Sequence, residues 1–239
     1  MRKENILRGD SLIFTNGFEI RQPTVSDIMD LGFEEYSWFK NCICSNISDM
    51  IVPLWGMGYD FEKIEEKDLL KILVGQNKAI FCEIFKYFTN AEKIDFIIDN
   101  NKEKLVGQIN NKHFHIDEKI LFLIKDFFCK INKIKHSRMR KFIGEKTKKS
   151  ILDEDYEEYL FELKENKEKN EDYFGNLLSD LVIINKRDWN FVYSLYLSQL
   201  YEEIYKTSKK SKIDLTLQGI YCGNIDGGKI PSSSLDLNN

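Results

Sequence analysis

Apolar residues recur at helical spacing through much of the chain. The first such stretch returns every three or four positions and therefore presents one apolar face. Its apolar positions are Ile28, Leu31, Trp38 and Phe39. Thr24 precedes it and Asp27 stands three residues later, a pair typical of a capping box at a helix N-terminus. We therefore predict a helix over residues 25–44, with Gly32 marking close packing or a kink inside it.

Several later stretches show the same helical period. Helices are expected at residues 61–65, 68–73, 78–88, 91–100, 118–134 and 189–206, with a last helical or extended segment at 213–222. Aspartates are favoured just before a helix, and three stand in that position: Asp60, Asp117 and Asp188. Residues 51–59 differ, because Pro53 and two glycines interrupt a run of large apolar groups, and an exposed loop is predicted there.

Two short β-hairpins fit the remaining pattern. The first is predicted over residues 11–21, where Asn16-Gly17 separates two apolar runs. Asn-Gly favours a type I′ turn, because both residues tolerate the positive φ angles that this turn requires. A second hairpin is expected over residues 104–116, with Asn110-Asn111 at its turn.

Two adjacent segments of opposite charge follow. The basic block, residues 130–149, holds nine Lys or Arg and one acidic residue, a net charge of +8. Residues 153–172 hold ten acidic residues and three Lys, a net charge of −7. Such blocks either pair with each other or keep a protruding helix solvated. We expect a long, mostly exposed helical arm over residues 138–172, with an extended basic approach to it.

The predicted fold class is mainly α with one or two small β-hairpins, at residues 11–21 and 104–116, and a helical core with a long charged helical arm. Four parts are expected along the chain: an N-terminal hairpin plus helical region (1–136), a charged helical arm or insertion (137–172), a C-terminal helical region that packs on the first (173–231) and a flexible tail (232–239).

Composition narrows the class of protein. The 239 residues are 42% hydrophobic and 31% charged, with a formal net charge of −4 at pH 7. This apolar fraction supports a folded core and excludes a disordered chain. The longest apolar runs, such as residues 120–124, are far shorter than the roughly 18 residues of a membrane span, and no signal peptide is visible. A soluble protein without a membrane partner is expected.

Candidate catalytic groups are few. The chain has three histidines and five scattered cysteines, which we interpret as reduced and mostly buried thiols. His113 and His115 would share one face of a strand, a geometry that metal sites use, but nothing in the sequence places a third ligand such as His136 or Cys129 nearby. We therefore predict no enzyme, no cofactor, and no catalytic, cofactor-binding or metal-binding residues.

Aromatic and methionine side chains are the stronger candidates for function. Aromatic residues make up 13% of the chain, and Trp, Tyr and Met are enriched at protein interfaces. Core packing accounts for many of them. The predicted partner contacts are Trp55, Met57, Tyr59, Trp189 and Tyr221.

Two segments combine motifs that occur together in a known group of proteins. The N-terminal segment reads Phe18-Glu19-Ile20-Arg21-Gln22-Pro23-Thr24-Val25-Ser26-Asp27-Ile28, followed by Gly32, Glu35 and Tyr36. The C-terminal one is an amphipathic stretch from Trp189 to Ile204, then Tyr221-Cys222-Gly223-Asn224-Ile225-Asp226. These motifs resemble the tail assembly chaperones and tail-region accessory proteins of phages of low-GC Gram-positive bacteria. The resemblance covers residues 12–45 and 174–230 and supplies no catalytic residues.

The resemblance implies a non-enzymatic phage tail assembly chaperone or tail morphogenesis factor that binds the tape-measure protein in the host cytoplasm. Homo-oligomerisation stays open. One alternative is a virion structural or connector protein that is retained in the particle. Another is a nucleic-acid-binding or anti-defence phage protein that uses the basic block. Nucleic acid is the less favoured partner, because an acidic segment follows that block directly and the whole chain is acidic.

Overall fold

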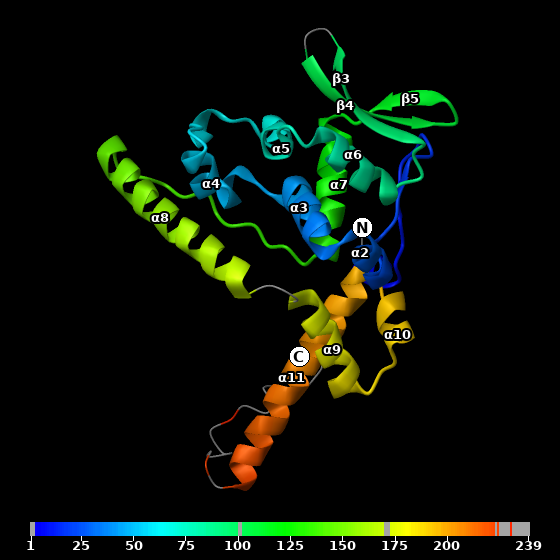
Figure 1. Cartoon of the computed structure of the whole chain (residues 1–239), viewed down its shortest axis with the longest axis vertical. Coiled ribbons are helices and arrows are strands. Elements are labelled where there is room, and N and C mark those ends of the chain that lie inside the picture. Colours follow the sequence, from blue (N-terminus) through cyan, green and yellow to red (C-terminus); the bar gives the residue numbers. More distant parts are fainter. Residues whose placement is uncertain (1–2, 100–101, 170–172, 223, 225–229, 231–239) are drawn as a thin grey trace.

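The computed structural model describes residues 3–99, 102–169, 173–222, 224 and 230, and these residues form a mainly α-helical fold with two small antiparallel sheets (Figure 1). The predicted fold class is thus confirmed. The α-helices are α1 (Lys3–Leu7), α2 (Val25–Leu31), α3 (Phe33–Cys44), α4 (Ile51–Gly56), α5 (Glu66–Val74), α6 (Lys78–Tyr87), α7 (Glu118–Ile131), α8 (Glu145–Lys169), α9 (Tyr173–Asn185), α10 (Trp189–Ser194) and α11 (Leu197–Tyr221). The 3-10 helices and strands are η1 (Ile47–Asp49), η2 (Phe61–Lys63), β1 (Leu12–Ile13), β2 (Glu19–Ile20), β3 (Lys93–Asp99), β4 (Lys102–Ile109) and β5 (Lys112–His115).

The N-terminal hairpin forms as predicted, but its turn differs. Leu12 pairs with Ile20 in the antiparallel register. Of the expected turn residues only Gly17 takes a positive φ, +82°, and the Phe14 amide donates to the Phe18 carbonyl at 2.8 Å. The loop therefore has three residues and ends in a left-handed glycine. Positive φ at both turn positions occurs instead at Asn110-Asn111, with angles of 50° and 61°, between β4 and β5.

The helix predicted over residues 25–44 is broken at Gly32. The capping box forms as expected: the Thr24 amide donates to Asp27 Oδ2 at 2.8 Å, and the Asp27 amide donates to Thr24 Oγ1 at 3.1 Å. Gly32 has a φ of +98°, which ends α2 and begins α3. Because glycine alone adopts such an angle at little cost, the chain can turn a corner here and still bury residues of both helices.

Residues 93–99 form the strand β3, so the helix predicted at 91–100 is wrong. β3 pairs antiparallel with β4, and β4 pairs with β5, so the second predicted hairpin is confirmed as part of a three-stranded sheet. Ile94, Phe96 and Ile98 share one face of β3, and their exposure rises along it: Ile94 is buried, Phe96 packs on the core and Ile98 is 79% exposed. The far end of the strand therefore projects beyond the core.

The exposed loop predicted at residues 51–59 is also wrong in its first part, which forms α4. Pro53 lies in the first turn of this helix, where a backbone amide would lack an intrahelical partner anyway. Leu54 is fully buried in a small second core with Phe61 and Leu152. Tertiary burial therefore favours the helix over the loop that proline and glycine suggest.

The single helix predicted over residues 189–206 is divided into α10 and α11. Leu195 and Tyr196 between them are extended. The Val25 amide donates to the Leu195 carbonyl at 2.9 Å, and the Leu197 amide donates to the Pro23 carbonyl at 2.9 Å. These long-range backbone hydrogen bonds satisfy groups that a continuous helix would have satisfied internally. From Leu197 the helix continues unbroken to Tyr221.

The main core draws side chains from both ends of the chain. Its centre is aromatic, because the Phe39 ring lies against the rings of Phe81, Phe85, Phe88 and Phe128. Helices α9 and α11 contribute buried leucines to the same core. The base of α11 is further anchored by Ser198, whose amide donates to Gln22 Oε1 at 3.2 Å. The turn after Tyr221 and the tail at 232–239 fall almost entirely outside the described residues.

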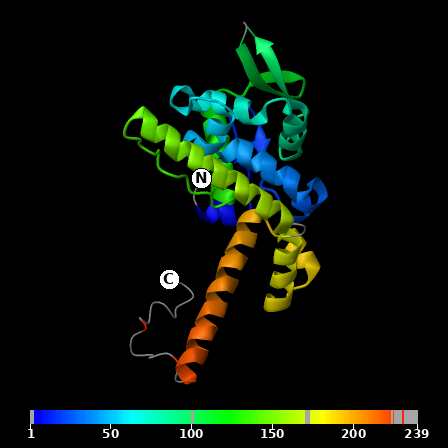
Figure 2. The same ribbon diagram turned by 60° about the vertical axis from the view of Figure 1, so that its left-hand side comes forward.

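Two long helices leave this core in different directions. α8 lies along the side of α4, and α11 extends away from the end opposite the three-stranded sheet (Figures 1 and 2). α8 begins at Glu145, later than the start predicted at 138, after residues 134–142, which have no regular secondary structure. Its first half is docked, with Leu152 fully buried and Lys148 only 6% exposed, so α8 is less exposed than predicted there.

Candidate functional site

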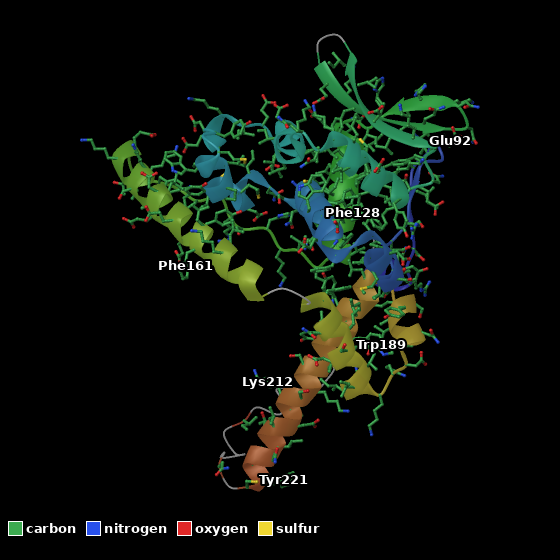
Figure 3. The ribbon with its side chains drawn as sticks, viewed as in Figure 1. Glu92, Phe128, Phe161, Trp189, Lys212 and Tyr221 are labelled. Atoms are coloured by element: carbon green, nitrogen blue, oxygen red, sulfur yellow. The ribbon has the colours of Figure 1, made fainter. Side chains whose placement is uncertain are left out.

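The five predicted partner contacts lie on three separate parts of the surface. Trp55, Met57 and Tyr59 stand at the end of α4 and just beyond it, with Met57 51% exposed. Trp189 begins α10 and Tyr221 ends α11, where it is 86% exposed (Figure 3). The structure therefore does not bring these residues together.

The second half of α8 carries an exposed apolar group that the contact prediction did not include. Leu160, Phe161 and Leu163 are 39%, 63% and 41% exposed, and Figure 3 places Phe161 on the outer side of the helix. Leu160 lies between the other two around the helix, and the three together span about half of its circumference. We call these three residues the α8 outer patch. Exposed glutamates, Glu157, Glu158 and Glu162, flank it. The patch combines large apolar side chains with negative charge.

Cations of the basic block pair with acidic residues of the same chain. Lys148 Nζ lies 2.7 Å from Glu62 Oε2, and Lys133 Nζ lies 2.8 Å from Glu202 Oε1. Lys130 Nζ lies 2.6 Å from Asp126 Oδ2, both within α7. Arg140 forms an ion pair with Asp155 of α8. Part of the block's positive charge is thus neutralised within the fold.

A surface pocket of about 600 Å³ opens beside α7. Apolar groups from Leu121, Phe122 and Ile134 line part of it. Polar and charged side chains complete the lining: Asn46, Glu66, Glu118, Lys125, Asp126, Cys129, Lys130 and His136. The pocket is large enough for a small molecule or a peptide side chain.

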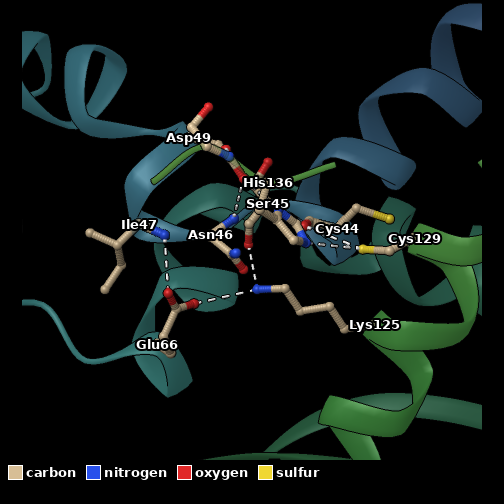
Figure 4. A network of polar contacts seen from close by, with 10 residues as sticks. Cys44, Ser45, Asn46, Ile47, Asp49, Glu66, Lys125, Cys129 and His136 are labelled. Carbon is tan, nitrogen blue, oxygen red and sulfur yellow. Dashed lines mark hydrogen bonds and ion pairs between the residues drawn. The ribbon is translucent and has the colours of Figure 1, made fainter. Parts of the chain in front are cut away.

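A thiol and an imidazole that line this pocket form a row with a carboxylate beyond its lining (Figure 4). Cys129 Sγ lies 3.4 Å from His136 Nε2, and His136 Nδ1 lies 2.6 Å from Asp49 Oδ2. We call these residues the Cys129 row. Its members come from α7, from the segment without regular secondary structure that follows α7, and from η1. Cys129 and His136 lie 80 and 87 residues after Asp49 in the sequence, so no local motif reveals the row.

Backbone amides hold the carboxylate end of the row. Asp49 Oδ1 accepts from the Ser137 amide at 2.8 Å, and Asp49 Oδ2 accepts from the Asn46 amide at 3.3 Å. A carboxylate fixed in this way sets the orientation of the His136 ring. Such a second partner is what keeps an imidazole aligned with a nucleophile.

Lys125 adds a fixed positive charge to the same wall. Its Nζ donates to the Ser45 carbonyl at 2.7 Å and lies 3.4 Å from Glu66 Oε2 (Figure 4). Glu66 Oε1 in turn accepts from the Ile47 amide at 3.2 Å. These contacts link the turn between α3 and η1 to helices α5 and α7.

The environment favours the charged forms of the Cys129 row. A hydrogen bond with the Cys44 thiol lowers the pKa of Cys129; burial opposes this, and His136 and Lys125 add to the lowering. Burial also opposes protonation of His136, but Asp49 and Cys129 outweigh it and raise the pKa of His136. The contact with Cys129, followed by burial, raises the pKa of Cys44.

This arrangement can supply a nucleophilic thiolate. An adjacent base and an orienting third group are the signature of an activated nucleophile. Sequence reasoning named Cys129 and His136 only as unplaced metal ligands and missed Asp49 altogether. The only local signal for Asp49 is its place three residues after Asn46, where it completes a capping box for η1. That signal indicates a helix start and gives no hint of the histidine.

The histidines of β5 are placed elsewhere. His113 and His115 alternate with the partly buried Phe114, so both imidazoles lie on the exposed face of the strand. Within the described residues, no group of three or more His, Cys, Asp or Glu side chains is arranged to hold a metal ion.

Two further results concern membrane-spanning helices and similarity to known proteins. Among the residues that the structure describes, no helix is both long and apolar enough to cross a bilayer. The chain matches no protein-family model, no curated protein and no solved structure at a significant level.

Proposed function

We propose that this protein acts without catalysis, by binding another protein, and that it serves as a phage tail assembly chaperone for the tape-measure protein in the host cytoplasm. The identity of the partner rests on the motif resemblance in residues 12–45 and 174–230. The observation that carries the binding role is the α8 outer patch. Large apolar side chains left exposed close together on one helix are typical of interaction sites.

The patch sits on a helix whose position is already set by the rest of the fold. Tyr156 of α8 packs so closely on α4 that a Cβ on Gly56 would lie 2.0 Å from its ring. Leu152 fills the second core one turn earlier. A partner that meets Phe161 therefore binds a surface that needs little ordering, which reduces the entropic cost of association.

The chemistry of the patch indicates the kind of partner. Large apolar groups flanked by glutamates suit an amphipathic helix that presents an apolar stripe with basic residues beside it. A tape-measure protein, being long and helical, would offer such stripes repeatedly. Many copies of this chain could then coat one partner through individually weak contacts.

Gene order and co-purification test this proposal together. A tail-tube gene upstream and a very long helical-repeat gene downstream are expected next to this gene. The long product, co-expressed with the tagged chain, should co-purify with it. Metabolic or defence genes at both sides would remove the basis of the tape-measure assignment.

A paired set of variants tests the surface. The double substitution Phe161→Ser, Leu163→Ser should weaken binding at least about tenfold, because truncated aromatic anchors cost roughly 1.4 kcal/mol or more. Ile183→Ser on α9 is the matched control, since Ile183 is 72% exposed and lies away from α8. Equal binding by the double variant and the control would contradict a role for the α8 outer patch.

The alternative of a retained virion protein differs in one observable. A chaperone leaves before the tail is complete, so purified particles should contain no copies of this chain. Stoichiometric copies in particles would favour the structural or connector role. The nucleic-acid alternative has less support, because Lys148, Lys133 and Arg140 of the basic block are engaged in ion pairs.

A further inference from the structure

Two cysteines lie next to each other beside the pocket, and only one of them, Cys129, lines it (Figure 4). Cys44 ends α3, and Cys129 lies near the end of α7. Cys129 Sγ lies 3.7 Å from the Cys44 carbonyl oxygen. We propose that Cys129 and Cys44 form a redox-active dithiol, in which Cys129 attacks a disulfide admitted through the pocket and Cys44 resolves the product.

The geometry supports Cys129 as the attacking thiol. His136 Nε2, at 3.4 Å, can take the proton from Cys129 Sγ, while Asp49 holds the other ring nitrogen at 2.6 Å. Lys125, which lines the same pocket, adds a positive charge that favours the thiolate. The thiolate is the reactive form of cysteine, so this environment raises its reactivity at neutral pH.

Access to the thiol comes from the pocket rather than from bulk solvent. Cys129 is only 8% exposed, yet it is one of the residues that line the pocket of about 600 Å³. The apolar side of that pocket, at Leu121 and Ile134, can cover the carbon chains of a small disulfide. Lys125 and Lys130 offer positive charge to carboxylates on such a molecule.

The exchange balances without a further reactant. Cys129 gives its proton to His136, and its sulfur attacks one sulfur of a disulfide RSSR. The S–S bond of RSSR breaks, a mixed disulfide forms on Cys129, and the departing thiolate takes the proton from His136. Cys44 sulfur then attacks Cys129 Sγ, and its proton goes to the second departing thiolate. One disulfide is reduced to two thiols, and the Cys44–Cys129 pair loses two electrons.

Cys44 is suited to the resolving step. It is 1% exposed and does not line the pocket, so a substrate cannot reach it directly, whereas the Cys129 sulfur lies against its backbone. The remaining buried cysteines, Cys42 and Cys82, do not line the pocket. Cys222 is exposed and reacts independently of the pocket. A second cysteine next to Cys129 favours disulfide exchange over acyl transfer, which would need only Cys129.

Oxidised glutathione is the probe for the test, and the full chain with Cys222→Ser is the starting protein. After incubation at pH 7 and tryptic mapping, the expected product has a Cys44–Cys129 disulfide and no glutathione adduct. Cys44→Ser should stop the reaction at a stable glutathione adduct on Cys129. Cys82→Ser, at a buried cysteine outside the pocket, is the control and should behave like the starting protein.

The rates separate an activated thiol from an ordinary one. His136→Gln should slow adduct formation in the Cys44→Ser protein at least about tenfold at pH 7, because less thiolate is present. An unmodified Cys129 in the starting protein would overturn the proposal, and this measurement needs no variant at either cysteine of the pair. A permanent adduct on Cys129 with Cys44 intact would also overturn it. Release of nitrophenol from a nitrophenyl ester without disulfide exchange would instead assign the row to acyl transfer.

Discussion

The indole nitrogen of Trp55 donates a hydrogen bond of 2.9 Å to the carboxylate of Asp153, which joins the end of α4 to α8. Trp55 was expected to face a partner, but its polar group is already engaged within the chain. The contact adds to the burial of Leu152 and the close approach of Tyr156 to Gly56. Together they hold the first half of α8 against the fold.

The docking of α8 depends on one fully buried side chain. Leu152→Ala should cost about 2–5 kcal/mol, because it leaves a cavity in the small second core. The expected result is faster proteolytic cleavage within residues 145–169. Leu163→Ala, at a position that is 41% exposed, is the matched control and should change stability by no more than about 0.5 kcal/mol. Equal protection of α8 in both variants would show that Leu152 does not hold the helix.

The contact between Gly56 and Tyr156 can be tested by a double-mutant cycle. A Cβ at position 56 would lie 2.0 Å from Tyr156 Cε2, so Gly56→Ala should displace the ring and loosen α8. In the Tyr156→Ala background the same change should cost much less. Denaturant unfolding of the four proteins gives the coupling energy, expected to be about 1 kcal/mol or more. Additive effects would mean that the two side chains do not meet in solution.

Acid should weaken the start of α2 through Asp27. Burial opposes ionisation, but Arg21 and Thr24 outweigh it and hold the pKa of Asp27 below its ordinary value. A lowered pKa contributes stability above the unfolded value of about 3.9, and this contribution is lost as pH falls through the folded value. Asp27→Asn should therefore destabilise the protein at pH 6 and have a smaller effect at pH 3.

Chemical denaturation at both pH values measures this difference. Asp30→Asn is the control, because Asp30 lies in the same helix and is exposed. A destabilisation by Asp27→Asn that is the same at pH 3 and pH 6 would exclude the ionised carboxylate as the source of the capping stability.

His136 should show the opposite pH dependence. Although burial opposes it, Asp49 and Cys129 raise the pKa of His136, so its contribution is fully present below the unfolded value of about 6.5. It is lost as pH rises through the folded value. His136→Gln should destabilise the protein most below pH 6.5, and the effect should shrink above neutral pH.

Thermal unfolding of the wild type and His136→Gln between pH 5.5 and 9 checks this expectation. His113→Gln is the control, since His113 is exposed on β5 and lies away from the pocket. A difference between wild type and His136→Gln that grows with pH would contradict the ion pair with Asp49.

Local sequence determined the beginnings of several elements. Caps form at three helix starts where the sequence predicts them. Thr24 and Asp27 form the capping box of α2, and the carboxylates of Asp117 and Asp188 accept backbone hydrogen bonds at the starts of α7 and α10. The turn at Asn110-Asn111 and the charged helix α8 were likewise predictable. These features depend on residues within a few positions of one another, so the sequence contains the whole interaction.

Only the tertiary structure decided where helices break and which polar groups meet. Residues 195–196 are extended because their backbone pairs with residues 23–25, and residues 93–99 form a strand because β4 lies beside them. The Cys129 row has the same origin, since the packing of α7 on α3 and the return of the chain past η1 bring Asp49 to His136. The contacts of residues 195–196 and the contact of Asp49 with His136 join residues more than 80 positions apart, whereas β3 and β4 are close in sequence. The free energy that stabilises the long-range contacts comes from burial in a shared core, which no local pattern encodes.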